Sequence, residues 1–555
     1  MLCESVGDTM ENSNFIKTII EADLKSGKHE VPVTRFPPEP NGSLHLGHAR
    51  AIITNYSLAK AYGGVFNLRF DDTNPVKEDM MFVETIKKDI EWLGCHWDHL
   101  YFASDYFTEM FERAMVLVEK GLAYVCDLSG EAIRSTRGDL TSPGENSPFR
   151  DRSIEENKRL FLGMKQGEYA DGSRVLRAKI DMASPNMNMR DPVVYRIQRA
   201  YHHNTKDQWC IYPMYDFAHP LEDAIEGITH SLCSLEFEDH RPLYDWFVTH
   251  TEMPKVPRQI EFGKLMIANQ VTGKREIKKL VEAGVVDGWD DPRLITLSGL
   301  RRRGVPPEAI HSFVMALGLP KSQGLTDIGM FYETVRDYLG QTARRIHGVV
   351  DPLKVVITNY PEGKTESMVA DYHRDNPEQG SREVFFGKEL YIERADFIKQ
   401  KPNKKWKRLA LDVEVRLMHA YFIKAHDVVM NADGDIEAVL CTYDEETLSG
   451  SGFNERKPNG TIHFVEASRA QKVELRLFDD LVKDFTDQSV AFSDKINVDS
   501  KQVTHGFIEG AVKPLKGEVF QFTRLGYFAL DKDSEGGNYV FNRVVELKSS
   551  FKGKR

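Results

Sequence analysis

Two histidines three residues apart, His45 and His48, carry the clearest chemical signal in this sequence. They follow a proline-rich loop, residues 37–42, and precede a helix-compatible segment, residues 49–62. Side chains three apart project from one side of a helical turn, and the free N–H groups that open a helix attract phosphate. Gly47 leaves backbone open to a flat ring that a Cβ would block. The segment predicts a nucleotide phosphate site; the alternative is that the histidines cap the helix or bind a metal.

The elements that would position these histidines are a strand, a loop and a helix. β-Branched residues predict a strand over 31–36, and helical spacing predicts a helix over 47–62. A second strand over 65–70 and a helix over 77–93 follow. In such a unit the loop leaves the carboxyl edge of a parallel strand, where ligands bind. The pattern indicates the first half of a nucleotide-binding fold.

Two carboxylates, Asp71 and Asp72, stand at the end of the second predicted strand. At that edge of a sheet they are placed to meet the ammonium group of a bound ligand. The alternative is that Asp72 or Thr73 caps the next helix, with Pro75 favouring an abrupt turn into that helix.

The HLGH motif at residues 45–48 resembles the HIGH signature of class I aminoacyl-tRNA synthetases. The longer segment 37–49 is similar to the form of this signature in glutaminyl members of the glutamyl/glutaminyl subfamily. Residues 68–75, LRFDDTNP, resemble a pattern of the same subfamily. The resemblance runs almost to the C-terminus.

A second signature of that family, its KMSKS-type loop, is matched by residues 271–275, VTGKR. Lys274 and Arg275 agree with the family, whereas Thr272 and Gly273 replace its Met-Ser pair and remove a hydroxyl group that contacts phosphate. Gly273 still offers a backbone N–H and conformational freedom. We therefore expect a mobile loop at the end of a strand over 259–265.

The resemblance implies an α/β multidomain fold: a Rossmann-type class I catalytic domain with an inserted acceptor-binding domain, a helical connector and C-terminal antiparallel β-barrels. Short strands with frequent turns after residue 351 agree with such barrels. The expected domain bounds are a lead-in at 1–30, the catalytic domain at 31–100 and 211–275, the acceptor-end insertion at 101–210, the connector at 276–350 and two anticodon-binding barrels at 351–555.

The implied reaction is ATP-dependent activation of L-glutamine to glutaminyl-adenylate, followed by transfer to the 3′-terminal ribose of tRNA(Gln), with release of pyrophosphate and AMP. The catalytic residues would be His45, His48, Lys274 and Arg275. ATP, with Mg²⁺ on its phosphates, would be bound by Glu39, Pro40, Asn41, His45, Gly47, His48, Thr272, Gly273 and Lys274. No protein-held metal and no zinc are expected.

By the same resemblance, Arg35 binds the glutamine carboxylate, Asp71 its ammonium and Tyr215 its side-chain amide, with Gln259 near the pocket. Glutamate-using relatives place an arginine where this chain has Cys233. Without that cation a buried glutamate carboxylate would be unpaired, which costs several kcal/mol. We therefore expect glutamine to be the substrate.

The residues that would contact tRNA fall into two groups. Leu140 would wedge against the first base pair of the acceptor stem, and Asp239 would read that stem from the shallow minor groove. Anticodon bases would meet Arg345, Lys407, Arg408, Arg416, Gln521 and Arg524. Met418 stands where the family has a further arginine, so one anticodon contact is in doubt.

The bulk composition is that of a folded soluble protein of 555 residues with a formal net charge of -11. Such a charge speaks against nucleic acid on a simple count, but basic clusters at 301–303 and 399–408 are candidate phosphate contacts. Six scattered cysteines argue against a disulfide framework. The lack of a membrane-spanning apolar run or signal peptide predicts a cytoplasmic protein without a membrane partner, and we expect a monomer.

Three other functions remain open from the sequence. The first is a non-discriminating glutamyl-tRNA synthetase of the same fold. The second, prompted by Thr272 and Gly273, is a catalytically inactive RNA-binding paralogue. The third, a shortened tRNA-modifying relative, fits less well because such proteins lack the barrels expected after residue 350.

Overall fold

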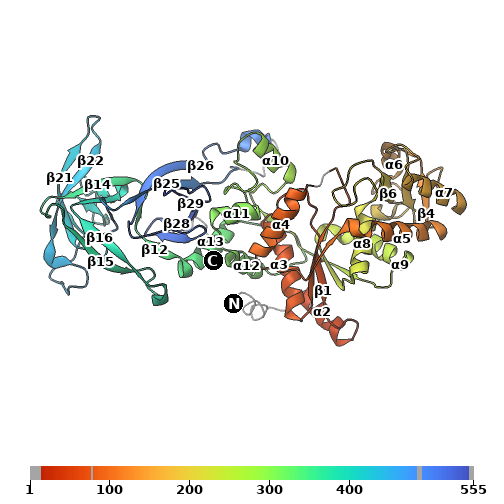
Figure 1. Ribbon diagram of the computed structural model, residues 1–555, viewed down its shortest axis with the longest axis horizontal. Coiled ribbons are helices and arrows are strands. Elements are labelled where there is room, and N and C mark those ends of the chain that lie inside the picture. The colour runs from red at the N-terminus through yellow and green to blue at the C-terminus, as the bar shows by residue number, and fades with distance from the viewer. Residues whose placement is uncertain (1–13, 77–78, 484–489, 549–555) are drawn as a thin grey trace. The chain divides into compact units, whose positions relative to one another are not determined.

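The computed structural model describes residues 14–76, 79–483 and 490–548 and divides the chain into two compact units (Figure 1). The first unit takes Met1–Ile267 and His311–Thr326, and the second takes Ala268–Ile310 and Asp327–Arg555. Among the described helices, none has both the length and the apolar content needed to cross a bilayer.

The first unit contains the predicted parallel nucleotide-binding sheet. Strand β1 (Val33–Phe36) pairs in parallel with β2 (Val65–Phe70), which pairs in parallel with β3 (His99–Phe102). Helix α3 (Leu46–Ala61) follows β1, so the strand, loop and helix expected around the histidines are confirmed. Strand β8 (His230–Ser234) pairs in parallel with β9 (Arg258–Phe262). The β8 end joins β1 through Thr229, whose amide donates to the Val33 carbonyl at 3.0 Å.

Helix α4 (Met80–Trp92) begins later than the sequence pattern predicted, and residues 77–78 lie outside the described part of the chain. Its N-cap is Asp79, whose side chain accepts from the Met81 amide at 2.9 Å. The alternative that Asp72 or Thr73 caps this helix is therefore wrong, because the chain turns at Pro75 and Val76 and the helix starts at Met80. Asp72 and Thr73 instead make other contacts at the end of β2.

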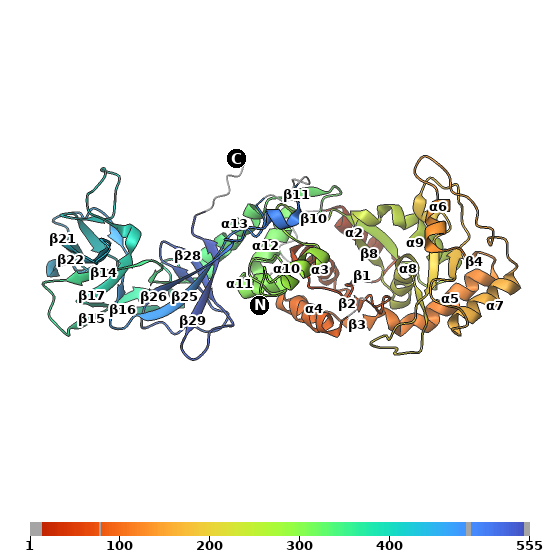
Figure 2. The same cartoon turned by 90° about the horizontal axis from the view of Figure 1, so that it is seen from above.

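An antiparallel sheet interrupts the nucleotide fold where an insertion was expected. It consists of β4 (Ala123–Cys126), β5 (Val175–Ala178), β6 (Val193–Ile197) and β7 (Ile211–Pro213). Helices α5 (Phe107–Glu119) and α7 (Ile154–Lys165) lie side by side against β4 (Figure 2). Their apolar faces share one core with α8 (Tyr215–Glu226) and α9 (Arg241–His250).

Two short strands close the first unit. The predicted strand over 259–265 is split into β9 and β10 (Leu265–Ile267), and β10 pairs in parallel with β11 (Gly324–Thr326). The break falls at Gly263, whose amide donates to the Pro320 carbonyl at 2.7 Å instead of continuing the strand. A Cβ at Gly263 would collide with the Ser322 carbonyl, so the close approach requires glycine.

The second unit begins with helices, as the sequence predicted. These are α10 (Lys274–Glu282), α11 (Leu297–Arg303) and α13 (Ile328–Thr342). Helix α12 (Pro307–Leu317) crosses the boundary between the two units. Helix α11 ends at Gly304 in the left-handed conformation (φ +97°), the expected use of a glycine at this position.

Two seven-stranded sheets form the rest of the second unit. The first has the order β12-β27-β28-β29-β25-β26-β13, and the second has the order β23-β20-β21-β22-β14-β17-β24. Antiparallel pairs predominate, but each sheet also holds two parallel pairs, such as β12 with β27 and β14 with β22. Each sheet curls around its own apolar core, which agrees with the expected barrels.

The strands of the first sheet are β12 (Arg344–Ile346), β13 (Gly348–Val349), β25 (Gln471–Phe478), β26 (Lys501–Ile508), β27 (Val519–Phe522), β28 (Gly526–Leu530) and β29 (Tyr539–Glu546). Those of the second are β14 (Pro352–Ile357), β17 (Glu389–Glu393), β20 (Glu414–Leu417), β21 (Phe422–Met430), β22 (Ile436–Asp444), β23 (Thr461–Ile462) and β24 (Val465–Glu466).

Candidate active site and tRNA contacts

The first turn of α3 holds the two histidines of the motif in a fixed arrangement. His45 is the N-cap, and its Nδ1 accepts from the Gly47 amide at 3.0 Å. His48 Nδ1 accepts from the His45 amide at 3.1 Å, which completes a capping box. The ring centroids are 3.9 Å apart. Because each Nδ1 accepts, each ring carries its hydrogen on Nε2, and that atom is the one able to donate to a ligand. The predicted phosphate role and the capping alternative are thus compatible.

Gly47 has a structural reason to lack a side chain. A Cβ there would lie 2.8 Å from Cε1 of His45 and 3.2 Å from the Leu265 carbonyl oxygen. Such contacts would push the His45 ring out of its cap. The glycine therefore protects the arrangement of the motif itself, in addition to leaving space for a ligand ring.

The loop before α3 is tied to the end of β2. The Asp71 amide donates to the Pro38 carbonyl at 3.0 Å, and the Asp79 amide donates to the Pro40 carbonyl at 3.0 Å. Glu39 is exposed and accepts a hydrogen bond from the Asn41 side chain. The structure thus places the proposed ATP-binding loop and the proposed ammonium-binding Asp71 at one edge of the sheet.

Asp71 is a buried carboxylate at the end of β2. It accepts from the Thr73 hydroxyl at 2.8 Å and from the Thr73 amide at 3.3 Å. Burial raises the pKa of Asp71 to about 6. The carboxylate is therefore ionised at neutral pH, and a bound ammonium group would stabilise it further.

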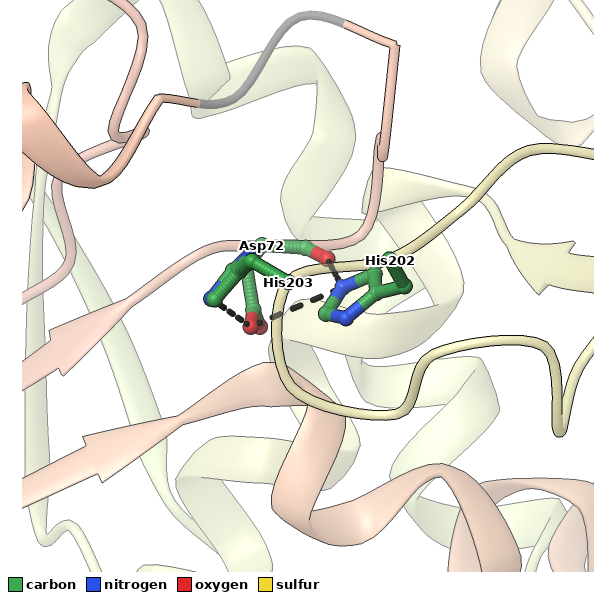
Figure 3. A group of neighbouring side chains, drawn as sticks. All are labelled: Asp72, His202 and His203. Carbon is green, nitrogen blue, oxygen red and sulfur yellow. Dashed lines mark hydrogen bonds and ion pairs between the residues drawn. The ribbon is translucent and has the colours of Figure 1, made fainter.

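Three side chains beside Asp71 could in principle hold a metal ion: Asp72, His202 and His203 (Figure 3). His202 Nε2 lies 2.8 Å from the Asp72 carbonyl oxygen, and its Nδ1 accepts from the amide of residue 204 at 3.1 Å. Both ring nitrogens are thus engaged with backbone. Asp72 also accepts from Ser104, through the amide at 2.8 Å and the hydroxyl at 2.7 Å. These contacts fasten the loop that carries residues 202–204 to the end of β2, and this role suits the three side chains better than binding a cation.

Arg35 lies on β1 with 1% of its surface exposed. Its Nε donates to Asp223 Oδ1 at 3.0 Å, its Nη1 to the Leu232 carbonyl at 3.0 Å and its Nη2 to the Ser231 hydroxyl at 2.7 Å. The sequence did not indicate Asp223 or Ser231, because their relation to Arg35 spans almost 200 residues. Most of the donors expected to face a substrate carboxylate are therefore used within the protein.

Cys233 lies directly beside this guanidinium group. Its Sγ is 3.6 Å from Arg35 Nη2 and 3.8 Å from His219 Nε2. The position expected to lack the cation of glutamate-using relatives therefore still has a positive group beside it. Burial lowers the pKa of His219 to about 3, so this ring is neutral at physiological pH. The cation next to Cys233 is Arg35, and Asp223 balances its charge.

Tyr215 and Gln259 belong to elements on either side of Cys233. Tyr215 opens α8, and its ring stacks on His219 with centroids 5.2 Å apart and planes within 9°. Gln259, on β9, is buried and donates through Nε2 to the Phe237 carbonyl and to Glu261 Oε1, both at 2.9 Å. Strand pairing aligns Cys233 with Glu261. Arg35, Tyr215, Cys233 and their neighbours thus share one region of the first unit.

The second signature lies in the other unit. Val271 is buried in a core formed with Ile277 and Leu280 of α10 and with Leu481 and Val482. Lys274 and Arg275 form the first turn of α10, with Gly273 as N-cap, so they do not belong to a loop as predicted. A Cβ at Gly273 would collide with the Glu276 carboxylate. Thr272 lies in the short segment before the helix.

The two acceptor-stem candidates lie on the surface of the first unit. Leu140 is 85% exposed, so its side chain is accessible to a partner. Within its loop, Asp139 Oδ1 accepts from the amides of Thr141 and Ser142 at 2.7 and 2.8 Å. Asp239 is exposed, and its carbonyl accepts from the Asn186 side chain at 2.7 Å.

The anticodon candidates fall into separate groups in the second unit. Arg345 and Gln521 face each other in the pairing of β12 with β27, and Arg345 Nε donates to Gln521 Oε1 at 3.1 Å. Arg408 and Arg524 share the buried carboxylate of Asp396, at 3.3 and 2.7 Å.

Arg416 stands apart from these pairs. It donates to the Thr447 carbonyl and the Ser449 hydroxyl, both at 2.9 Å, and packs over the Phe422 ring. Lys407 is exposed, and Met418 is partly buried. The structure therefore brings together Arg345 with Gln521 and Arg408 with Arg524.

The basic triplet at 301–303 has a structural use. Arg302 pairs with Asp531 at 3.0 Å and Asp533 at 2.9 Å. Arg303 is buried and donates to the Val544 carbonyl at 3.0 Å. These two residues hold α11 against the barrel sheet and are not phosphate contacts.

Comparison with known proteins gave matches over most of the chain. Residues 31–334 match the model described as "tRNA synthetases class I (E and Q), catalytic domain". Residues 343–444 and 461–531 match two models described as anti-codon binding domains of the same class. The glutamine–tRNA ligases of Clostridium kluyveri and Clostridium perfringens are each 54% identical, over 99% and 98% of this chain and 99% of their own lengths. That of Pseudomonas putida is 51% identical, over 97% of this chain and 96% of its own length.

Proposed function

The chain belongs to the class I tRNA synthetases of the E and Q group, and from this we propose that it is a glutamine–tRNA ligase. It activates L-glutamine with ATP to glutaminyl-adenylate and pyrophosphate, then transfers the glutaminyl group to the 3′-terminal ribose of tRNA(Gln), releasing AMP. The observation that carries this proposal is identity above 50% over nearly the full length of several glutamine–tRNA ligases. Cys233, with Arg35 neutralised by Asp223, supports glutamine over glutamate.

The first step is attack of the glutamine carboxylate on the α-phosphate of ATP. This carboxylate is already ionised at neutral pH, so the site needs no general base. It must align the reactants and stabilise the charge that builds on the phosphate oxygens. In our proposal the Nε2–H groups of His45 and His48 donate to those oxygens, and Lys274 and Arg275 supply positive charge.

The nucleotide would rest on the loop before α3, at Glu39, Pro40, Asn41 and Gly47, and on Thr272 and Gly273. Mg²⁺ bound to the ATP phosphates would add charge neutralisation. The exposed Glu39 carboxylate is an oxygen ligand of the kind that this ion prefers.

In the amino-acid site, Asp71 would pair with the substrate ammonium and Arg35 would face its carboxylate. Tyr215 would offer its hydroxyl to the side-chain amide, and Gln259 would shape the pocket beside Cys233. A site that hydrogen-bonds a polar group rejects analogues that lack the matching group. This reasoning supports strict use of glutamine.

The tRNA would be held at both of its ends. The exposed Leu140 would wedge against the first acceptor pair, and Asp239 would read that stem. Arg345, Lys407, Arg408, Arg416, Gln521 and Arg524 would contact the anticodon bases. We place the reaction in the cytoplasm, where aminoacyl-tRNA is used, and propose that the enzyme is a monomer; light scattering of the purified protein would test that state.

A paired charging assay tests the proposed function. Purified protein, ATP and tRNA(Gln) are incubated with glutamine or with glutamate, and the charged tRNA is measured. We expect efficient charging with glutamine alone. Preferred charging with glutamate would identify a non-discriminating glutamyl enzyme. Absence of both charging and tRNA-dependent pyrophosphate exchange would identify an inactive RNA-binding paralogue.

The raised pKa of Asp71 predicts a pH dependence for glutamine use. Below about pH 6 the carboxyl group is neutral and no longer attracts the substrate ammonium, so kcat/KM for glutamine should fall about tenfold per pH unit. Above that pH the carboxylate is ionised and kcat/KM should level off. The measurement is tRNA-dependent pyrophosphate exchange between pH 5 and 8. In Asp71→Asn this acidic limb should disappear along with most of the activity; its persistence would assign the limb to another group.

A further inference from the structure

A histidine and a carboxylate form a half-exposed pair where the short helix η3 (Leu235–His240) meets α9. His240 Nδ1 lies 2.6 Å from Oδ1 of Asp216, a residue in the first turn of α8. The two side chains are 30% and 31% exposed. Because an ionised carboxylate can only accept, Nδ1 carries the shared hydrogen. Among the contacts of the described residues, Nε2 of His240 has no hydrogen-bond partner, so this atom is left to meet a ligand.

The pair lies beside the residue expected to read the acceptor stem. Asp239 directly precedes His240, and its carbonyl accepts from the Asn186 side chain at 2.7 Å. The next residue, Met187, accepts through its carbonyl from Nε and Nη2 of Arg137, at 3.1 and 2.6 Å. Hydrogen bonds therefore join the segment that carries His240 to the end of helix α6 (Gly130–Thr136).

Arg137 is joined in turn to the loop of Leu140. The carbonyl of Arg137 accepts from Arg190 Nη1 at 2.9 Å. The same nitrogen donates to the carbonyls of Asp139 and Ser142, at 3.0 and 2.9 Å, on either side of Leu140. The two acceptor-stem candidates thus belong to one connected surface of the first unit, and the histidine is part of it.

The charge of this surface depends on the protonation of His240. The charged groups that act on its ring are the carboxylates of Asp216 and Asp239 and the guanidinium of Arg137. With a neutral ring the carboxylates outnumber the cations, which opposes the approach of an RNA phosphate. A protonated ring adds a second cation and balances them.

Protonation also reverses what Nε2 can offer. In the neutral ring, with the hydrogen on Nδ1, Nε2 is an acceptor and would face a phosphate oxygen with a lone pair. In the imidazolium, Nε2 carries a hydrogen and donates. Hydrogen bonds from such a cation to phosphate are among the strong ones in proteins. Only the charged ring can therefore hold a phosphate here.

The surroundings favour the charged ring. The hydrogen bond to Asp216, the charge of that carboxylate and the charge of Asp239 raise the pKa of His240, although partial burial and Arg137 oppose the rise. An unperturbed histidine titrates near about pH 6.5. The charged form of His240 thus extends further toward neutral pH than that of an ordinary histidine.

We propose that His240, held by Asp216, donates from Nε2 to a phosphate of the tRNA acceptor end and makes the affinity for tRNA depend on pH. The inference rests on the proposed glutamine–tRNA ligase function and adds a conditional contact to it. Affinity is highest where the imidazole is protonated and falls as the pH rises through its pKa. His240 binds tRNA and takes no part in the chemical steps.

The test is equilibrium binding of fluorescently labelled tRNA(Gln) to the full-length protein between pH 6 and 8.5 at constant ionic strength. The Kd of wild type should rise at least about fivefold from the acidic to the basic end. The slope of log Kd against log salt concentration should become shallower by about one unit over the same range, because one phosphate contact no longer releases a counterion.

Variants of the pair separate a phosphate contact from a role in folding. His240→Arg should keep the tight binding at every pH, and His240→Asn should show the weak binding at every pH. Asp216→Asn removes the carboxylate that raises the pKa, so the fall in affinity should move to lower pH, a shift that loss of structure alone does not produce. The matched control is His96→Asn, a change of an exposed histidine of the same unit, and it should keep the pH dependence of wild type.

Three results would overturn the inference: a wild-type Kd that is constant from pH 6 to 8.5, a folded His240→Asn variant that keeps the full pH dependence, or a change of Kd with no change of salt slope. Circular dichroism reports folding. Wild-type protein that binds tRNA(Gln) with the expected pH dependence but charges no glutamine would instead overturn the proposed function. The two failures are therefore distinguishable.

Discussion

Replacing Cys233 with arginine should raise the ratio of glutamate to glutamine use by about a hundredfold or more, equivalent to roughly 2.7 kcal/mol. The new guanidinium would lie beside Arg35, where Asp223 already accepts from two arginines and two hydroxyl groups. The added charge would therefore lack a carboxylate until glutamate enters. Glutamine cannot neutralise it, so kcat/KM for glutamine should fall. The measurement is charging of tRNA(Gln) with each amino acid.

Cys233→Ser is the control for this change, because it keeps the size of the side chain and adds no charge. Its selectivity ratio should resemble that of wild type. If Cys233→Arg remains folded and keeps the wild-type preference, then residue 233 does not face the substrate side chain. In that case the assignment of the pocket would have to move elsewhere in the first unit.

Removing the Nε2 donor of His48 should lower kcat by about 10²–10³-fold, the usual effect of losing one donor to a developing oxyanion. His48→Asn makes this change selectively. Asparagine can supply an acceptor near the place of Nδ1, which takes the His45 amide at 3.1 Å, but it does not reach the place of Nε2. Thermal stability should be preserved while pyrophosphate exchange is lost.

His48→Gln is the complementary variant. Its amide nitrogen reaches toward the place of Nε2, whereas the acceptor for the His45 amide is lost. We expect more residual activity than in His48→Asn, together with a loss of about 1 kcal/mol in the free energy of unfolding from the weakened cap. If His48 acted through capping alone, His48→Asn would keep both stability and activity, whereas His48→Gln would lose both.

The sequence alone was sufficient to predict the strands and the helix that surround the HLGH motif. β-Branched residues before the loop and helical spacing after it predicted β1, α3 and β2 within one or two residues. It was less informative in the barrels, where β21 (Phe422–Met430) and β26 (Lys501–Ile508) carry polar and charged side chains on their exposed faces. Their pairing with β22 and β25 defines them, and such long-range pairing is not visible in local composition.

In the candidate site, too, contacts between residues far apart in the chain could not be predicted from the sequence. Arg35 and Cys233 could be proposed from motifs, but the ion pair between Arg35 and Asp223 joins residues 188 apart. Lys274 and Arg275 were expected on a loop before the helical connector, whereas the structure places them in the first turn of α10, whose buried residues are Ile277 and Leu280. Polar partners of this kind arise from tertiary packing, which a single sequence does not encode locally.

The core under α10 has a consequence for how this protein can be divided. The helix has nine residues, and isolated helices of that length do not persist in water. Its apolar face is covered in part by Leu481 and Val482, which follow strand β25 about two hundred residues later. A truncated chain that ends after α13 would keep Lys274 but would lose the side chains that shelter its helix. A protein of this kind whose C-terminal half is replaced must therefore bring other apolar side chains to cover this face of α10.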